Sequence, residues 1–335
     1  MTGKQADSEP GGTIAVTGAG GMLGLDVMAE LARRGLPAAR FDRAGLDVTD
    51  AAAVARTLGG LAGGGGGLRA VIHCAAYTAV DRAESEPDAA RRANAEAPGH
   101  VAAACAAAGV GARMVLVSTD YVFGGDLPAH LAYAETDPTG PLGVYGATKL
   151  AGERAALAAA PGLVAVARTS WLFGAGGPNF VATMLKLARA GRDLAVVDDQ
   201  IGAPTFTGHL AAALVDLATD PGLDLATGSA PGVFHLPASG ECSWHGLAAE
   251  AFAISGVAPA SLRPIPAAEY PTPARRPANS RLANTRRPPL PHWREGLREY
   301  LELTGHGRGH GGGAAGGAGG AARMDATPPV HVSAP

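Results

Sequence analysis

The chain has 335 residues, of which 47% are apolar and 17% charged, a composition typical of a globular protein with a sizeable core. The net charge of −3 provides no basic field for a nucleic-acid backbone. Its three cysteines are far apart in the sequence, which favours a reducing compartment. The polar N-terminus is unlike a signal peptide, and no apolar run is long enough to span a bilayer. We therefore expect a cytoplasmic protein without nucleic-acid or membrane partners.

Apolar runs alternate with helical patterns through the first half of the chain. Strands are predicted at 13–19, 37–41, 68–76, 112–120 and 162–173, with helices at 22–35 and 88–108. Strands that alternate with helices form βαβ units, so we expect an α/β fold with a Rossmann-like, doubly wound parallel sheet.

The pattern is less regular after residue 173. Helices are predicted near 179–190, 208–219, 244–255 and 293–303, and short strands near 194–197 and 233–236. The glycine-rich end of the chain cannot bury a core. We therefore predict a disordered leader at 1–11, a dinucleotide-binding domain at 12–173, a smaller mixed α/β substrate-binding region at 174–304 that interleaves with it, and a disordered tail at 305–335.

A glycine-rich turn joins the first strand to the first helix. The stretch "TGAGGMLG" places Gly18, Gly21 and Gly24 there. Glycine tolerates a positive φ and lets the backbone approach a ligand, and the N–H groups of a helix start can hold a pyrophosphate. The spacing is G-x-x-G-x-x-G and not G-x-G-x-x-G, but the strand–turn–helix context favours a dinucleotide site over a purely structural turn.

The residues after the second strand bear on which dinucleotide is bound. Asp42 lies 18 residues after Gly24 and could accept from an adenosine ribose 2′-hydroxyl. Arg43 could instead pair with a 2′-phosphate. The two residues point to NADH and to NADPH respectively, so the choice stays open, and Asp42 could also be a solvated loop charge.

Tyr145 and Lys149 form a Y-x-x-x-K pair that places both side chains on one helix face. The pKa of a free tyrosine is about 10, and a nearby ammonium lowers it, so the phenol can give a proton to a carbonyl oxygen as hydride arrives. The lysine could also reach the ribose hydroxyls of a nicotinamide cofactor. Three of the 27 basic residues are lysines and 24 are arginines, which argues against a chance surface pair at this position.

Hydroxyl groups end the clearest strand, where a third catalytic group is expected. Ser118 and Thr119 lie at its carboxyl end, the edge at which open α/β sheets bind ligands. Asp120 and Tyr121 follow and could contact sugar hydroxyls or stack on the substrate. The alternative is that the two hydroxyls only cap the end of the strand.

These motifs together resemble the extended short-chain dehydrogenases/reductases, and longer blocks are similar to the dTDP-4-dehydrorhamnose reductases. The blocks are "GLDVTD" (45–50), "AAYTAVDRAESEPDAARRANA" (75–95), "STDYVF" (118–123), "PLGVYGATKLAGE" (141–153), "RTSWLFG" (168–174), "DDQIGAPT" (198–205) and "YPTPARRPANSRL" (270–282). The resemblance runs in order from about 13 to 303. It implies NADPH- or NADH-dependent reduction of the C4 ketone of dTDP-4-dehydro-L-rhamnose.

By position, the resemblance also implies roles for individual residues. Tyr145 would be the proton donor, Lys149 its partner, and Thr119 would assist at the carbonyl. The sugar would contact Asp120 and pack on Trp171. Cofactor contacts are implied at Gly21, Met22, Leu23, Asp47, Val48, Ala75, Ala76 and Tyr77.

The chain departs from the family at the residues that bridge metal-linked dimers, and the resemblance leaves two alternative functions open. The family includes dimers bridged by Mg²⁺ through glutamates, but Asp26 stands at the first such position and no glutamates match the others, so no metal site is expected. Homodimer formation is left open. The alternatives are a reductase of another nucleotide 4-keto-6-deoxysugar and a non-catalytic subunit like the β subunit of methionine adenosyltransferase.

Overall fold

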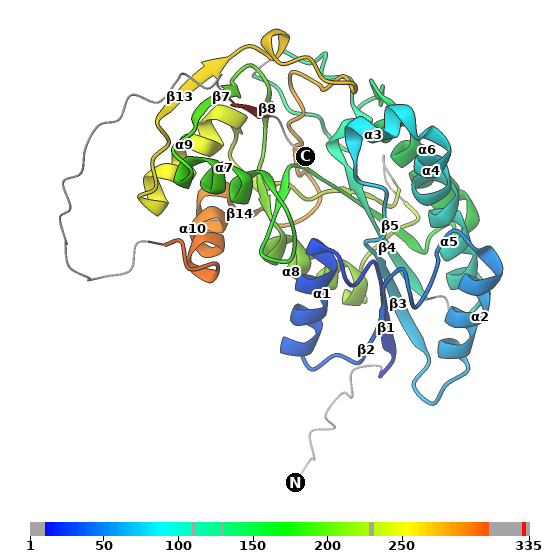
Figure 1. Cartoon of the computed structure of the whole chain (residues 1–335). Helices are drawn as coiled ribbons and strands as arrows, with labels where there is room; N and C mark the ends of the chain where they lie inside the picture. Colours follow the sequence, from blue (N-terminus) through cyan, green and yellow to red (C-terminus); the bar gives the residue numbers. More distant parts are fainter. Residues whose placement is uncertain (1–10, 109–111, 129, 228–230, 308–329, 333–335) are drawn as a thin grey trace.

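A six-stranded parallel sheet forms the centre of the larger half of the molecule (Figure 1). The computed structural model describes residues 11–108, 112–128, 130–227, 231–307 and 330–332. The strands are, in spatial order, β2 (Ala38–Phe41), β1 (Thr13–Thr17), β3 (Leu68–His73), β4 (Arg113–Thr119), β5 (Val164–Thr169) and β10 (Val233–His235). The strand order reverses between β1 and β3, and a crevice for ligands opens at such a point outside the carboxyl ends of the strands.

Helices cover both faces of this sheet, and Figure 1 shows α1 on one side and α2 and α5 on the other. The first face carries α1 (Met22–Arg33) and α8 (Thr207–Thr219). The opposite face carries α2 (Ala51–Ala62), α5 (Ala97–Ala107) and α6 (Val144–Ala159).

Neighbouring residues of one strand enter different cores, because a strand alternates its side chains between faces. In β1, Ile14 and Val16 pack toward α1 and α8, whereas Ala15 packs toward α2 and α5. The inner strands β1, β3, β4 and β5 are mostly buried and rich in apolar residues, since both faces of the sheet are covered. The predicted Rossmann-like doubly wound sheet is therefore confirmed.

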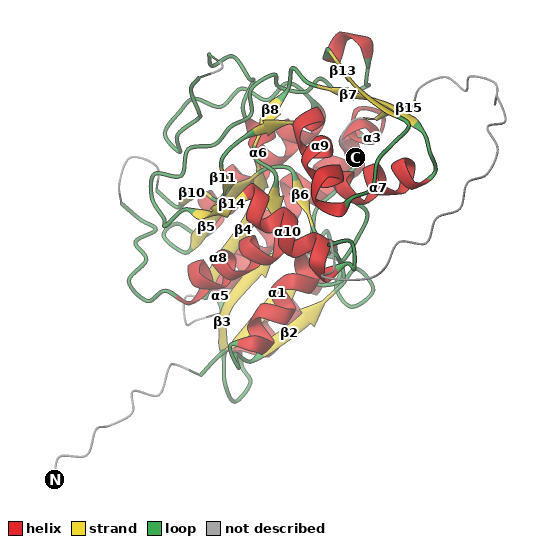
Figure 2. Cartoon of the chain, turned by 90° about the vertical axis from the view of Figure 1, so that its left-hand side faces the viewer, coloured by secondary structure: helices red, strands yellow, loops and turns green. Residues whose placement is uncertain are grey.

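A second core lies beside the sheet and is built by the later part of the chain (Figure 2). Its helices are α7 (Phe180–Arg189), α9 (Trp244–Ser255) and α10 (Trp293–Leu303). Its parallel strands are, in spatial order, β13 (Ser261–Ile265), β7 (Asp193–Val197) and β15 (Val330–Val332). Strand β10 and helix α8 come from the same part of the chain but join the large sheet and its cover.

Short elements complete the chain between the two cores. Two-residue strands pair as β6 (Leu172–Phe173) with β9 (Thr205–Phe206) and as β8 (Ile201–Gly202) with β12 (Cys242–Ser243); β11 (Ala238–Ser239) pairs with β14 (Leu290–His292). The short helices are α3 (Val80–Ser85), α4 (Pro87–Arg91), the π turn η1 (Arg92–Glu96), and the 3₁₀ turns η2 (Asp120–Val122) and η3 (Ala267–Glu269).

The structure corrects the sequence prediction in three places. The single helix expected at 88–108 is interrupted by the π turn at Arg92–Glu96, where a Cβ on Gly152 of α6 would lie 1.9 Å from the Asn94 carbonyl oxygen. Helix α2 was not predicted, although Asp50 caps it by accepting from the Ala53 N–H at 2.9 Å. Part of the tail expected to be disordered forms β15, while 308–329, 333–335 and most of the leader lie outside the described residues.

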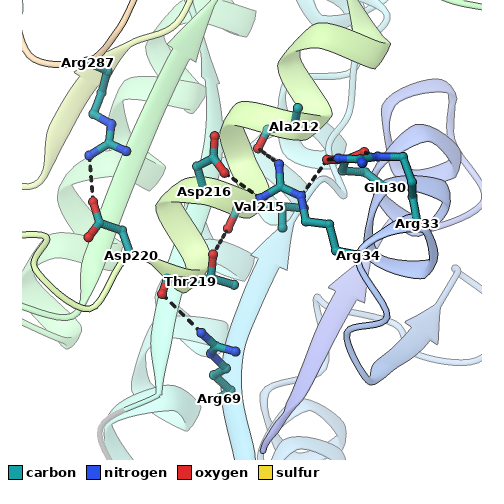
Figure 3. A network of polar contacts seen from close by, with 10 residues as sticks. All are labelled: Glu30, Arg33, Arg34, Arg69, Ala212, Val215, Asp216, Thr219, Asp220 and Arg287. Carbon is teal, nitrogen blue, oxygen red and sulfur yellow. Dashed lines mark hydrogen bonds and ion pairs between the residues drawn. The ribbon is translucent and has the colours of Figure 1, made fainter. Parts of the chain in front are cut away.

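Polar contacts tie α1 to α8 at the edge of the sheet remote from the carboxyl ends of its strands (Figure 3). Arg34 donates to Glu30 of α1 at 2.6 Å, to Asp216 of α8 at 2.5 Å and to the Ala212 carbonyl at 3.2 Å. Hydrogen bonds from Arg33 and Arg34 lower the pKa of Glu30 to about 2.

Among the described residues, no helix is long and apolar enough to cross a lipid bilayer.

Candidate active site

The glycine turn after β1 is wound too tightly for side chains at two of its positions. Gly18 has φ +68°, and a Cβ there would lie 2.6 Å from the Ala75 nitrogen at the end of β3. A Cβ on Gly24 would lie 2.2 Å from the Gly18 oxygen. Gly21 is the N-cap of α1 and carries no side chain over the first helical turn, which contains Met22 and Leu23. These glycines leave open backbone at a helix N-terminus, so this turn fits a dinucleotide pyrophosphate.

The end of β2 places a different arginine at this turn from the one that the sequence suggested. Asp42 is exposed, and its Oδ1 accepts from the Ala44 and Gly45 N–H groups at 3.1 and 3.0 Å, which stabilises the local turn. Arg43 is exposed and acts electrostatically on Asp47. A Cβ on Gly20 would lie 3.5 Å from Asp42 Cβ and 3.7 Å from Arg40 Nη2, so both side chains lie beside the turn. Arg40 was not among the residues predicted from the sequence, yet strand alternation places residues 40 and 42 on one side of the chain.

Asp47 and Val48 lie in the loop between β2 and α2. Asp47 Oδ1 accepts from the Thr49 N–H at 2.9 Å and from its hydroxyl at 2.8 Å, and these bonds lower the pKa of Asp47. The Val48 carbonyl oxygen lies 3.4 Å from His100 Nδ1. One carboxylate oxygen of Asp47 therefore stabilises its own turn.

The residues after β3 are held by a buried asparagine that the sequence analysis also missed. Asn94 accepts from the Tyr77 N–H at 2.8 Å and donates to the Tyr77 carbonyl at 3.0 Å. It also donates to Thr148 of α6 at 3.4 Å. Ala75 and Ala76 precede this clamp and follow the strand that abuts Gly18. Asn94 lies in the π turn, so the interruption of the helix serves to aim this amide at the loop.

Tyr145 and Thr119 come together where α6 begins and β4 ends. A hydrogen bond joins their hydroxyl groups. Burial and the charge of Asp120 raise the pKa of Tyr145 to about 12, and the bond with Thr119 opposes this rise. The direction differs from the sequence expectation that Lys149 lowers this pKa. The phenol is therefore protonated at neutral pH, the state that a proton donor needs.

Asp120 and Tyr121 follow Thr119 directly. Asp120 is 2% exposed and accepts from the Thr119 hydroxyl at 3.0 Å, and burial raises its pKa to about 7. The Tyr121 ring meets the Tyr145 ring edge-on, with centroids 6.0 Å apart. Tyr121 and Tyr145 line one hollow together with Glu84, Ala274, Arg275 and Pro277. The strand end thus places an acid, two phenols and a hydroxyl beside one another.

Lys149 lies one turn after Tyr145 and points toward the end of β4. Its Nζ donates to the Val117 carbonyl oxygen at 2.7 Å, and only 5% of the residue is exposed. Burial lowers the pKa of Lys149 to about 8, while the charge of Glu153 opposes that shift. The residue therefore lies near its titration point at physiological pH.

The structure separates two of the predicted substrate residues from this cluster. Ser118 donates its hydroxyl to Glu153, a buried residue that was not predicted to belong to the site. Trp171 has φ 48°, and its ring stacks on Trp244 with centroids 3.6 Å apart. A Cβ on Gly202 would lie 2.5 Å from that ring, so Trp171 is packed against the second core.

Within the described residues, no group of three His, Cys, Asp or Glu side chains is arranged to hold a metal ion. Asp26 on α1 has one buried carboxylate oxygen without a partner.

Comparisons with known proteins place these features in context. The family model described as RmlD substrate binding domain matches residues 12–305 of this chain. A dTDP-4-dehydrorhamnose reductase of Streptomyces griseus is 44% identical over 290 residues, which cover 85% of this chain and 91% of that protein. A probable dTDP-4,6-dihydroxy-2-methyloxan-3-one 4-ketoreductase of Streptomyces antibioticus is 40% identical, with 85% and 92% covered.

Solved structures give the same picture. A dTDP-4-dehydrorhamnose reductase of Bacillus anthracis, solved in complex with NADP, superposes with a TM-score of 0.78 at 33% identity, and the match covers 87% of this chain and 99% of that one.

Proposed function

Because this chain belongs to the dTDP-4-dehydrorhamnose reductase family of NAD(P)H-dependent oxidoreductases, we propose that it reduces the C4 ketone of dTDP-4-dehydro-L-rhamnose to dTDP-L-rhamnose. The observation that carries the proposal within the site is the hydrogen-bonded pair of Tyr145 and Thr119 at the carboxyl end of β4. That edge of the sheet also holds the glycine turn, so a dinucleotide and a ketone can meet there.

Tyr145 is the proton donor in this proposal. The bound dinucleotide supplies a hydride to the carbonyl carbon, and the phenol of Tyr145 gives its proton to the carbonyl oxygen. The C=O bond becomes a CH–OH group, and the phenolate that is left recovers a proton from water. Thr119 hydrogen-bonds Tyr145 and assists at the same oxygen.

The role proposed for Lys149 is to stabilise the Tyr145 phenolate. A phenol whose pKa is raised to about 12 is a weak acid, so the anion that it leaves needs nearby positive charge. The Lys149 ammonium supplies that charge from the same helix face. We expect it also to hold the nicotinamide ribose.

The cofactor-binding residues are proposed on the glycine cradle and on the loops beside it. The pyrophosphate would lie on the turn of Gly18, Gly21, Met22, Leu23 and Gly24. The end of β2 and the loops at 47–48 and 75–77 would line the rest of the dinucleotide. The exposed guanidinium of Arg40 beside Gly20 favours NADPH, because the 2′-phosphate adds an anion at this end of the cofactor.

The Arg40→Ala variant is expected to raise the KM for NADPH by about 10-fold, which is the loss of one charge-assisted hydrogen bond. The KM for NADH should change little, because NADH lacks the 2′-phosphate. Initial rates with each cofactor at saturating sugar substrate measure the difference.

Arg43→Ala is the matched control, because Arg43 is a neighbouring exposed arginine that faces Asp47. It should leave both KM values near those of the wild type. A rise in the KM for NADPH in Arg43→Ala, with none in Arg40→Ala, would return the assignment to Arg43.

The reaction is tested by consumption of NADPH in the presence of dTDP-4-dehydro-L-rhamnose generated enzymatically. Turnover that depends on the sugar supports the proposal. Binding of NADPH by the folded protein without turnover of this sugar would reject it.

A second substrate has specific support. The relative from Streptomyces antibioticus bears the name of a 4-ketoreductase for a different dTDP-linked ketosugar and is nearly as similar to this chain as the rhamnose enzymes. A reductase of another nucleotide 4-keto-6-deoxysugar would use the same Tyr145 chemistry. Comparison of kcat/KM for the two ketosugars decides between them.

Cys74, Cys105 and Cys242 are free thiols, which supports the proposal that the protein functions in a reducing compartment such as the cytoplasm.

A further inference from the structure

Helix α6 carries a third buried polar residue on the face that holds Tyr145 and Lys149. Glu153 follows Lys149 by four residues, so the three side chains lie along one side of the helix. Glu153 is 2% exposed and Lys149 5%. Tyr145 and Lys149 have roles in the proposed reaction, whereas no role has yet been given to Glu153.

Three donor groups hold the Glu153 carboxylate. The Ser118 hydroxyl of β4 donates to Oε1. Arg168 of β5 donates from Nε to Oε1 at 3.0 Å and from Nη2 to Oε2 at 2.7 Å, and it is itself 5% exposed. Ser118 and Arg168 are opposite each other in the β4–β5 register. Both residues therefore lie on neighbouring strands of the sheet, and their hydrogen bonds fix the position of the carboxylate.

The simpler explanation of the Glu153–Arg168 ion pair is that it stabilises the fold. The cost of burying two charges shows that stability alone does not explain it. Removing two charges from water is costly, and replacement of a buried ion pair by well-packed apolar side chains is often neutral or stabilising. Stability alone therefore gives little reason for an ion pair at this position. Its place one turn from Lys149 suggests an electrostatic reason.

The other groups around Lys149 cannot supply a negative charge at neutral pH. His73 and Cys74 approach it from β3 and the residue that follows. Burial lowers the pKa of His73 to about 3 and raises the pKa of Cys74 to about 12, so both are neutral. On α6 itself, Tyr145 is protonated. The charge of Glu153 remains, and it opposes the effect of burial on the pKa of Lys149.

We infer that Glu153, fixed by Arg168 and Ser118, is a positioning residue that keeps the Lys149 ammonium charged inside the protein. It acts through Lys149 and touches neither the substrate nor the cofactor. The inference rests on the role proposed above for Lys149 in the reduction. The ion pair with Arg168 holds the Glu153 carboxylate in place, where its negative charge acts on the ammonium.

The first test is a direct titration of Lys149, which the low lysine content makes practical. The chain has three lysines, so NMR of protein labelled with ¹³C-lysine gives few side-chain signals, and Lys149→Arg assigns the one of interest. Glu153→Gln should move the titration of Lys149 down by roughly one pH unit or more. Glu153→Asp, which keeps the charge, should restore it toward the wild-type position.

The second readout is the pH profile of kcat/KM for the ketosugar. The alkaline limb in the wild type should follow the loss of charge from Lys149, and Glu153→Gln should move this limb to lower pH by the same shift as the titration. A merely structural defect would lower kcat/KM at every pH and leave the limb in place.

A double variant guards against misfolding, because Glu153→Gln leaves Arg168 buried without its partner. Glu153→Gln with Arg168→Met removes both charges and keeps an acceptor for Ser118. It should shift the Lys149 titration in the same direction but by less, because the positive charge of Arg168 is lost as well. Asp216→Asn is the control for breaking an ion pair far from the site (Figure 3) and should leave the limb unchanged.

An unshifted Lys149 titration in either folded variant would overturn the inference, as would a failure of both variants to fold, which would make the pair structural. The titration needs no substrate. A wild type that does not reduce the sugar would therefore reject the proposed function without deciding the electrostatic inference.

Discussion

The Tyr145→Phe variant is expected to lose about 10²–10⁴-fold in kcat while it binds NADPH as the wild type does. The substitution removes the phenol hydroxyl that is proposed to donate the proton, and it keeps the ring that packs edge-on against Tyr121. The hydride then arrives at a carbonyl whose developing negative charge has no acid beside it. Single-turnover rates with saturating NADPH and sugar measure the chemical step directly.

A second buried tyrosine serves as the control for that variant. Tyr300 of α10 is 3% exposed, and its hydroxyl accepts from Asn179 at 3.3 Å in the second core. Tyr300→Phe should leave kcat unchanged, with a loss of stability of about 1 kcal/mol. If Tyr145→Phe turned over like Tyr300→Phe, the phenol of Tyr145 would not be the acid.

The Lys149→Arg variant is expected to lose roughly 10²-fold in kcat although it keeps the positive charge. The pocket holds a compact ammonium that donates to the Val117 carbonyl at 2.7 Å, and a planar guanidinium is larger and differently shaped. The charge is then displaced from the Tyr145 phenolate that it is proposed to stabilise.

The pH profile separates this explanation from general damage. The pKa of Lys149 is lowered to about 8, so the wild type should lose activity as the pH rises through that value and the ammonium is lost. An arginine stays charged up to about pH 12, so the residual activity of Lys149→Arg should lack this limb. Lys186→Arg, at an exposed position of α7, should match the wild type. A Lys149→Arg enzyme with full turnover would contradict the need for lysine.

The sheet could be predicted from the sequence because its signals are local. Apolar strands such as β1 and β4 alternate with helices, and the glycines after β1 are required by close backbone contacts such as that of Gly24 with the Gly18 carbonyl. The Y-x-x-x-K spacing likewise placed Tyr145 and Lys149 on one helix face. These features need no knowledge of distant contacts.

The parts that could not be predicted depend on contacts between distant segments. The π turn that aims Asn94 at Tyr77 depends on the approach of α6 at Gly152. Ser118 was expected at the substrate, but its hydroxyl binds Glu153 because Arg168, on the neighbouring strand, fixes that carboxylate. Burial, which sequence alone does not measure, decides that the pKa of Tyr145 rises.

The most direct test of the central claim is the structure of the product that the wild-type enzyme forms from dTDP-4-dehydro-L-rhamnose and NADPH carrying deuterium at the transferred hydride position. NMR of the product should show deuterium at C4 of the sugar and the configuration of dTDP-L-rhamnose. Deuterium at another carbon, or the C4 epimer as the product, would contradict the proposed reaction.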